Sequence, residues 1–432
     1  MEHIELALIA LFFLLFANFS GKIEKSIFSG PMLFALVGLL FSPYLIDGID
    51  LELENEAIQF VAEFTLMILL FTDASRINIA LLRKEHTLPM QLLGISLPLT
   101  ILFGAIVAML MFDFLSLPTA LILAVILAPT DAALGQAVVS YEKIPIRIRQ
   151  TINVESGLND GIALPFLLLF VAIATSADTA SGTDDIAYWL EFAGKQIGFG
   201  TLIGAVIGYT GGKFVSYCQD NGIASKTFTD LSAVVLAILA FSLAESIHGN
   251  GYIAAFVAGL TLGNTAKHIC EGVYEFAETE GQLLTLLTFL FFGSLIIIPT
   301  FQTITLEMFI YAILSLTLIR IIPVFIGLYR DNLNFETKLF IGWFGPRGVA
   351  SILYGILILN STNLPNKEFI FNVSMLTVVL SIVLHGITAM PWSVAYSERI
   401  NKHKDIAGQE EHISVKAMPI KIIRKFIKEK RK

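Results

Sequence analysis

The stretch Ile126-Leu-Ala-Pro-Thr-Asp-Ala-Ala-Leu-Gly135 places a proline and a carboxylate in the middle of a long apolar run. Proline removes a backbone donor and ends or kinks a helix, so we expect an interrupted helix here. A second stretch, Gly342-Trp-Phe-Gly-Pro-Arg-Gly-Val-Ala-Ser351, repeats the combination with the opposite charge. Irregular backbone within a membrane is tolerated only where protein buries it or where it lines a cavity. The two stretches therefore predict a membrane protein with two broken helices at a buried site.

The overall composition agrees with this interpretation. Hydrophobic residues make up 55% of the 432 residues. Charged residues make up 15%, against about 25% in an average soluble protein. Cys218 and Cys270 provide neither a disulfide framework nor a metal-ligand pair. The sequence also has no P-loop, dinucleotide-binding or HExxH motif. We therefore expect no enzyme, no cofactor and no nucleic-acid partner.

Thirteen apolar segments are long enough to cross a hydrocarbon core, which takes about 20 helical residues. They lie near 4–20, 29–46, 56–73, 88–112, 116–140, 150–175, 188–217, 229–247, 250–265, 282–299, 304–329, 336–360 and 369–395. The two interrupted segments are the fifth and the twelfth. Two six-helix repeats, at about 4–175 and 229–395, would be separated by one span and so would have opposite orientations. The predicted fold is an all-α polytopic membrane protein with two inverted repeats and two broken, crossing helices.

The charges of the loops predict how the chain lies in the membrane. Of the 28 Lys and Arg residues, 24 fall in loops after odd-numbered spans or in the segment 398–432. Cytoplasmic loops carry an excess of these residues. We therefore expect a transport domain at 1–397 in the plasma (inner) membrane, with the N-terminus outside, followed by a basic cytoplasmic tail at 398–432. The end of the tail, 420–432, predicts either an amphipathic helix on anionic membrane lipid or a solvated segment.

Ionisable residues inside spans mark functional sites, because each costs about 2.5–3.5 kcal/mol to insert. Asp131 and Arg347 adjoin the two interruptions, where they could offset the partial charges of the helix ends. Glu155 would be an uncompensated buried charge unless an arginine pairs with it, and either Arg347 or Arg320 could do so. His385, a lone histidine in an apolar span, is expected to be a packing residue.

Span six begins with Asn153-Val-Glu-Ser-Gly-Leu-Asn-Asp-Gly-Ile162. At helical spacing, Ser156, Asn159 and Asp160 share one face. These oxygens suit a partly dehydrated monovalent cation, or a proton on the carboxylate. They are too few for calcium, which usually takes 6–8 oxygen ligands. Asp160 is therefore the expected carrier of both the ion and the proton.

Three motifs, Ala128-Pro-Thr-Asp131, Glu155-Ser-Gly-Leu-Asn-Asp160 and Gly345-Pro-Arg-Gly348, resemble signatures of the monovalent cation/proton antiporter family. That family includes bacterial sodium/proton antiporters and eukaryotic sodium/proton exchangers. The resemblance extends over essentially all thirteen spans. It implies that Na⁺ and H⁺ compete for Asp160. It also implies that Asn159 takes the place of a second aspartate found in electrogenic antiporters.

The resemblance implies further roles for residues around Asp160. Thr130 and Ser156 would supply additional oxygens to Na⁺, and Asp131 would assist. Asp73, in Phe71-Thr-Asp-Ala74, corresponds to an acidic residue near the end of span three, where some relatives carry the longer Glu. Glu155 would pair with Arg347 or Arg320 as a scaffold. The family also implies a homodimer.

The expected function is secondary antiport of Na⁺ or Li⁺ against H⁺, one for one and electroneutral, by competition at Asp160. K⁺/H⁺ antiport by the same architecture is an alternative, because the named oxygens do not distinguish these cations. Other classes of protein fit the sequence less well. An intramembrane hydrolase using Asp131 and Asp160 would not need an inverted pair of broken helices. A sensor would need an output domain that the short tail lacks, and a channel would need no protonatable carboxylate in a closed site.

Overall fold

The computed structural model describes residues 2–23, 26, 28–45, 56–85, 87–176, 186–266, 270–361 and 363–402, and the single positions 411, 413 and 415. Most of the predicted tail lies outside these residues, including the segment 420–432 with its predicted amphipathic helix. Within the described part of the chain, every regular element is a helix. The prediction of an all-α fold is therefore confirmed.

The helices follow the apolar segments that the sequence predicts. The first half contains α1 (Glu2–Ile23), α2 (Gly30–Leu40), α3 (Glu56–Ser75), α4 (Ile79–Glu85), α5 (Thr87–Gln91), η1 (Leu92–Ser96), α6 (Leu97–Met111), α7 (Leu117–Ile126), α8 (Gln136–Ser140) and α9 (Ile146–Ser176). The second half contains α10 (Ile186–Asp220), α11 (Lys226–Ser246), α12 (Gly251–Thr265), α13 (Cys270–Phe291), η2 (Phe292–Ile296), α14 (Ile297–Gln302), α15 (Leu306–Leu316), α16 (Leu318–Gly327), α17 (Phe335–Trp343), α18 (Val349–Leu359) and α19 (Lys367–Lys402).

Six helical stretches in the described residues are long and apolar enough to cross a membrane. They are Thr87–Met111, Ile146–Thr175, Phe228–Ser246, Glu280–Gln302, Leu306–Gly327 and Lys367–Lys402. Four shorter apolar helices accompany them, and two of these, α7 and α18, are the halves that adjoin the interruptions predicted from proline. Large apolar side chains are exposed along α1, α6, α10 and α11. Apolar surface on this scale fits a lipid environment.

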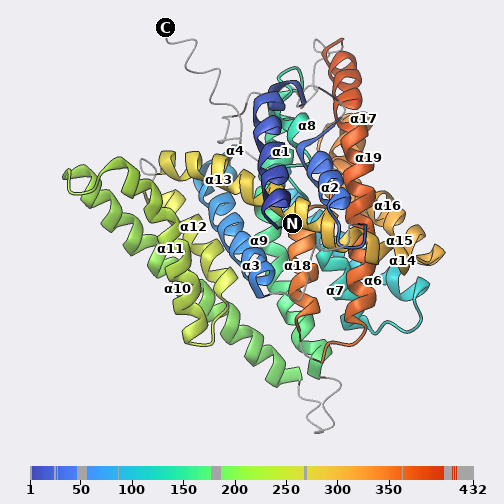
Figure 1. The fold of residues 1–432 in the computed structure, drawn as a ribbon, viewed down its shortest axis with the longest axis horizontal. Coiled ribbons are helices and arrows are strands. Elements are labelled where there is room, and N and C mark those ends of the chain that lie inside the picture. The colour runs from blue at the N-terminus through green and yellow to red at the C-terminus, as the bar shows by residue number, and fades with distance from the viewer. Residues whose placement is uncertain are drawn as a thin grey trace.

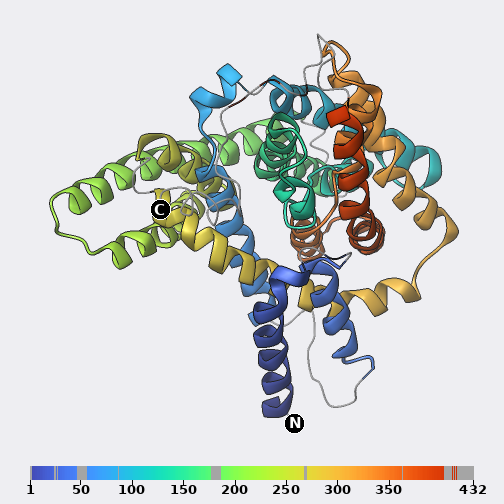
Figure 2. The same cartoon turned by 90° about the horizontal axis from the view of Figure 1, so that it is seen from above.

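The helices form two groups on either side of α9. In one group α10, α11, α12 and α3 pack together, and α13 joins them through α3 and α11. In the other, α6 packs on α7, and α15 and α18 pack on α19. Figure 1 shows the green helices α10 and α11 on the far side from α6, α7, α15 and α16, and Figure 2 shows the same separation from above. Because α9 contacts α7 as well as α10 and α3, the span with the candidate carboxylate lies between the groups.

Glycines allow the helices of the first group to touch backbone to backbone. A Cβ at Gly200 would lie 2.7 Å from the carbonyl oxygen of Asn250, and one at Gly208 would lie 2.5 Å from that of Ala258. Gly204, between them on α10, makes the same kind of contact with α12. On its other side α12 meets the backbone of α3 through Gly259 and Gly263. Small residues at these positions are what permits such close packing in a membrane.

Some boundaries differ from the predicted ones for identifiable reasons. Helix α2 ends at Leu40 although the apolar run continues to 46, because Pro43 disfavours helix at the residue before it. The π-helical turns η1 and η2 each precede a proline, Pro98 and Pro299, whose ring would clash with a carbonyl four residues earlier. A wider turn relieves that clash. Helix α19 continues to Lys402, beyond the predicted membrane segment and into the predicted tail.

Candidate functional site

The first interruption separates α7 from α8. Residues 127–135 form turns rather than helix. The carboxylate of Asp131 stabilises the turn, because its Oδ1 accepts the backbone N–H of Ala133 at 2.6 Å and that of Leu134 at 3.3 Å. Asp131 is half-buried, and Thr130 beside it is buried. The proline of this segment thus ends the helix where the sequence predicts.

The second interruption, 344–348, separates α17 from α18 and binds directly to the first. The backbone N–H of Asp131 donates to the carbonyl oxygen of Pro346 at 2.7 Å. Its carboxylate Oδ2 accepts the N–H of Val349, the first residue of α18, at 2.7 Å. A carboxylate at this end of a helix satisfies a free N–H and offsets the positive end of the helix dipole.

Arg347 performs the reciprocal task at the end of α7. Its side chain is fully buried, and Nη1 donates to the carbonyl oxygens of Ala128 and Pro129, both at 3.2 Å. The hydroxyl of Ser351 donates to the carbonyl oxygen of Ile126 at 2.7 Å. These groups satisfy carbonyls that the broken helix leaves open. The charged side chain of each interruption therefore binds open backbone groups at the other interruption.

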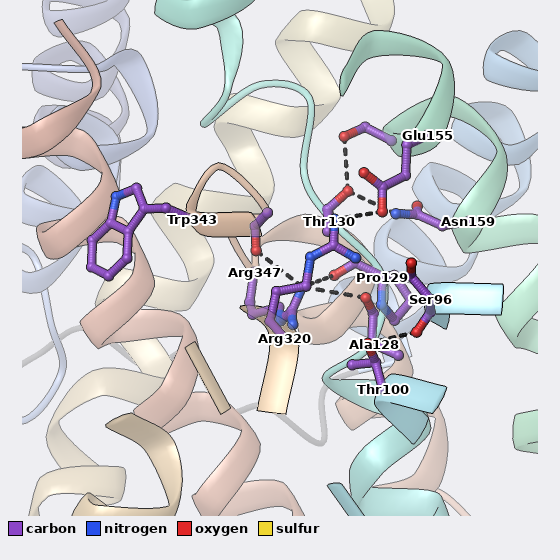
Figure 3. A network of polar contacts seen from close by, with 12 residues as sticks. Ser96, Thr100, Ala128, Pro129, Thr130, Glu155, Asn159, Arg320, Trp343 and Arg347 are labelled. Carbon is purple, nitrogen blue, oxygen red and sulfur yellow. Dashed lines mark hydrogen bonds and ion pairs between the residues drawn. The ribbon is translucent and has the colours of Figure 1, made fainter. Parts of the chain in front are cut away.

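A buried ion pair lies next to this crossing. Nη2 of Arg320 is 2.5 Å from Oε1 of Glu155, and both side chains are at most 2% exposed. The sequence left two arginines open as partners of Glu155, and the structure pairs it with Arg320. Arg347 binds backbone carbonyls instead. Figure 3 shows both arginines close to Thr130 and Asn159.

Three polar side chains form a buried cluster between the first interruption and α9. The hydroxyls of Thr130 and Ser156 are 2.8 Å apart, and Nδ2 of Asn159 donates to Oγ1 of Thr130 at 2.7 Å. All three are at most 4% exposed. Oδ1 of Asn159 is buried and has no hydrogen-bond partner among the described residues. An unsatisfied buried oxygen is costly, and a bound cation or water would relieve that cost.

The two remaining candidate carboxylates lie on α9 itself and on α3, which packs against it. Asp160 follows Asn159 on α9 and is half-buried, and its backbone carbonyl accepts the hydroxyl of Tyr354 from α18 at 2.6 Å. Asp73 is half-buried near the end of α3, which packs against α9. The structure thus brings Thr130, Ser156 and Asn159 into direct contact. It places the carboxylate of Asp131 against the start of α18.

The sequence does not predict the hydrogen bonds that α19 and Glu411 make in this region. Ser381 on α19 accepts the backbone N–H of Arg347, and His385 contacts the carbonyl oxygen of Trp343. Their spacing of four residues on one face of an apolar helix was the available signal. Glu411, from the tail, is fully buried and accepts the backbone N–H of Asn334 at the start of α17 at 2.7 Å. The sequence carries no signal for that contact.

Comparison with known families gives one match that extends over most of the chain. The family model described as sodium/hydrogen exchanger, transmembrane, matches residues 7–395. This range includes both interruptions, the ion pair and the polar cluster. It also includes α1 from Ala7 onward and almost all of α19.

Individual relatives are similar at low sequence identity. The K⁺/H⁺ antiporter NhaP of Alkalimonas amylolytica is 25% identical over 406 residues, which cover 91% of this chain and 67% of that protein. The Na⁺/H⁺ antiporter 2 of Zygosaccharomyces rouxii is 24% identical over 374 residues, with 82% and 46% covered. The Na⁺/H⁺ antiporter ApNhaP of Aphanothece halophytica is 26% identical over 352 residues, with 79% and 65% covered. The chain spans between about half and two thirds of the length of these relatives.

Among solved structures, the fold matches that of the sodium proton antiporter MjNhaP1 from Methanocaldococcus jannaschii at pH 8. The TM-score is 0.75 at 20% sequence identity, and the match covers 92% of this chain and 99% of that one. At 20% sequence identity, this match shows that the two proteins share a fold and nothing more. The predicted antiporter fold is confirmed by this match.

Proposed function

Because the chain belongs to the sodium/hydrogen exchanger family, a family of multi-pass membrane transporters, we propose that it exchanges Na⁺ or Li⁺ for H⁺ across the plasma membrane. Asp160 carries the proton and the cation in turn. The N-terminus lies outside and the C-terminus in the cytoplasm, and the chain works as a homodimer. Two relatives that are named Na⁺/H⁺ antiporters support this choice of cation.

The balance of charge around the two interruptions, on buried and half-buried side chains, carries the proposal. The group consists of Asp131 and Arg347 at the interruptions, Glu155 and Asp160 on α9, and Arg320 of α16, which pairs with Glu155. With all five ionised, the group has a net charge of −1. A buried charge without compensation is strongly unfavourable. One proton or one monovalent cation at Asp160 makes the group neutral.

This balance favours an electroneutral exchange of one cation for one proton. The loaded site is neutral whether it holds H⁺ or Na⁺, so either form can be carried across the apolar interior. The empty site retains its negative charge, which opposes its return without a load. Exchange is therefore coupled, and neither ATP nor a cofactor is required.

Oxygen atoms next to Asp160 complete the proposed cation site. Thr130 and Ser156 contribute hydroxyls and Asn159 contributes its carbonyl oxygen Oδ1, all from buried side chains. Hydroxyl and carbonyl oxygens suit hard monovalent cations. Asp73, near the end of α3, lies on a helix that packs against α9 and is not counted in the charge balance. Asp131 assists by fixing the turn that carries Thr130.

K⁺/H⁺ exchange is the second candidate. It is favoured by the similarity to the K⁺/H⁺ antiporter of Alkalimonas amylolytica, which extends over 91% of this chain. The same carboxylate and the same charge balance would serve K⁺. The two functions therefore differ in cation preference and not in mechanism.

Transport by the purified protein in liposomes tests both candidates. With an imposed pH gradient, adding Na⁺, Li⁺ or K⁺ in turn should dissipate the gradient for the transported ions only. Asp160→Asn should abolish the response. Asp113→Asn, the same change at an exposed loop position, should leave it intact. A response of the Asp160→Asn protein equal to that of the unaltered one would refute the assignment, and a transport current would refute electroneutrality.

A further inference from the structure

Helix α19 supplies hydrogen-bond partners to both ends of the second interruption. The hydroxyl oxygen of Ser381 accepts the backbone N–H of Arg347 at 2.6 Å. Nε2 of His385 lies 2.8 Å from the carbonyl oxygen of Trp343, the last residue of α17. Ser381 is fully buried and His385 is 1% exposed. One turn of α19 thus provides the acceptor for the N–H of Arg347 and a second partner for the carbonyl oxygen of Trp343, which also accepts the N–H of Gly345 at 2.8 Å.

One arrangement of protons links these groups in a row, although Nδ1 of His385 also lies 3.1 Å from the backbone carbonyl oxygen of Ser381. If Nε2 of His385 carries the ring proton, it donates to the carbonyl oxygen of Trp343. Nδ1 can then accept the hydroxyl proton of Ser381, whose oxygen is 3.2 Å away, while that oxygen accepts from Arg347. The chain of donors runs from Arg347 through Ser381 and His385 to Trp343. A neutral histidine is required for it.

This series of hydrogen bonds reaches the polar cluster through Arg347. The guanidinium of Arg347 donates to the carbonyl oxygens of Ala128 and Pro129, the two residues directly before Thr130. The hydroxyl of Thr130 in turn contacts Ser156 and Asn159. A displacement of Arg347 would therefore move an oxygen of the proposed cation site. Ser381 and His385 themselves lie outside that oxygen set.

We infer that Ser381 and His385 are positioning residues for cation exchange, which together hold Arg347 and hence the Thr130 hydroxyl in the geometry that binds the cation. The inference rests on the proposed function of the site. Their loss should weaken cation binding in a protein that still folds. If their role were confined to packing, their loss would lower stability and leave the affinity of the folded protein unchanged.

Three substitutions separate hydrogen bonding from packing. Ser381→Ala removes the acceptor for Arg347 and little volume. His385→Phe keeps a ring against Trp343, whose ring centroid lies 4.9 Å away, but removes both nitrogens. His385→Gln keeps an amide that can donate to the carbonyl oxygen of Trp343. Thr388→Val is the matched control, because Thr388 accepts the side-chain N–H of Trp343 and, in the described structure, has no hydrogen bond to the backbone of residues 344–348.

The experiment measures the KM for Na⁺, the maximal rate and the apparent Tm of each variant in proteoliposomes or detergent at one fixed pH. For Ser381→Ala and His385→Phe we expect the KM to rise about fivefold, the effect of one lost hydrogen bond. His385→Gln should recover most of that change. Thr388→Val should keep the KM of the unaltered protein. If Na⁺ is not transported, the cation identified by the gradient assay takes its place.

Two results would overturn the inference. One is an unchanged KM in Ser381→Ala, and the other is an equal KM for His385→Phe and His385→Gln. Should His385→Phe fail to accumulate, Ser381→Ala alone decides, because it removes only one oxygen atom. Failure of the proposed function itself would look different, because the unaltered protein would then dissipate no pH gradient with any cation.

Discussion

Replacing one member of the Glu155–Arg320 pair should destabilise the protein more than replacing both. Glu155→Leu leaves the guanidinium of Arg320 buried without its carboxylate, and its Nε and Nη1 have no other hydrogen-bond partner in the described structure. Breaking a buried pair in this way costs about 3–5 kcal/mol. Arg320→Met should have a cost of similar size, because it leaves the carboxylate of Glu155 buried. The double variant leaves no uncompensated charge, and replacing a buried pair with apolar residues is often neutral or stabilising.

The same variants should also differ in transport. Without Glu155 the empty site would have zero net charge and the loaded site +1, so cation binding should weaken. Without Arg320 the empty site would have a net charge of −2. The cation or proton should therefore bind more tightly and leave more slowly. The double variant restores −1 for the empty site and zero for the loaded site. We therefore expect it to exchange cations better than the Glu155→Leu single variant.

Apparent Tm in detergent and dissipation of a pH gradient in liposomes measure these two effects. The single variants should melt several degrees below the unaltered protein, and the double variant should melt above both of them. The reasoning is refuted if either single variant has the original Tm. It is equally refuted if the losses of the two single variants simply add up in the double variant.

Three further predictions follow from individual contacts. Gly204→Ala should lower the free energy of unfolding by about 1–3 kcal/mol, because the added carbon would overlap the backbone of α12. Gly198→Ala, where nothing lies within 4 Å of the added carbon, should not lower it. Thermal unfolding measures both variants. Thr130→Val should raise the KM for the transported cation, and Thr130→Ser should retain the original KM, since only the hydroxyl contacts Ser156 and Asn159. Glu411→Ala removes the carboxylate that accepts the backbone N–H of Asn334, the residue directly before α17, at a cost of about 1 kcal/mol. Limited proteolysis should then cut the tail faster than in the unaltered protein, and an unchanged cleavage rate would contradict the contact.

The interruptions were predictable because their signals are local. A proline with a neighbouring charge in an apolar run marks both breaks, and the sign of each charge indicates which helix end it faces. Asp131 and Arg347 accordingly bind the start of α18 and the end of α7. The face shared by Ser156 and Asn159 followed from helical spacing alone.

Other features depend on tertiary distances that a sequence does not contain. Arg320 and Arg347 are both arginines in apolar spans, and which one meets Glu155 depends on how the helices pack in three dimensions. The contact of Glu411 with α17 joins residues 77 positions apart. The inverted repeats, the orientation in the membrane and the homodimer remain predictions from sequence order and loop charge.

The glycine contacts among α10, α12 and α3 have a mechanical consequence. Helices that touch through backbone atoms have no side-chain rotamers between them to exchange, and sliding one past another would separate the surfaces and open voids. We therefore expect α10, α12 and α3 to move together as one rigid unit, like a stiff plate. Helix α9 meets this plate differently, since Gly161, next to Asp160, presents a bare backbone to the ring of Phe256. Because the ring of Phe256 occupies the space that a Cβ at position 161 would fill, any larger residue there would push the helix that carries Asp160 away from α12.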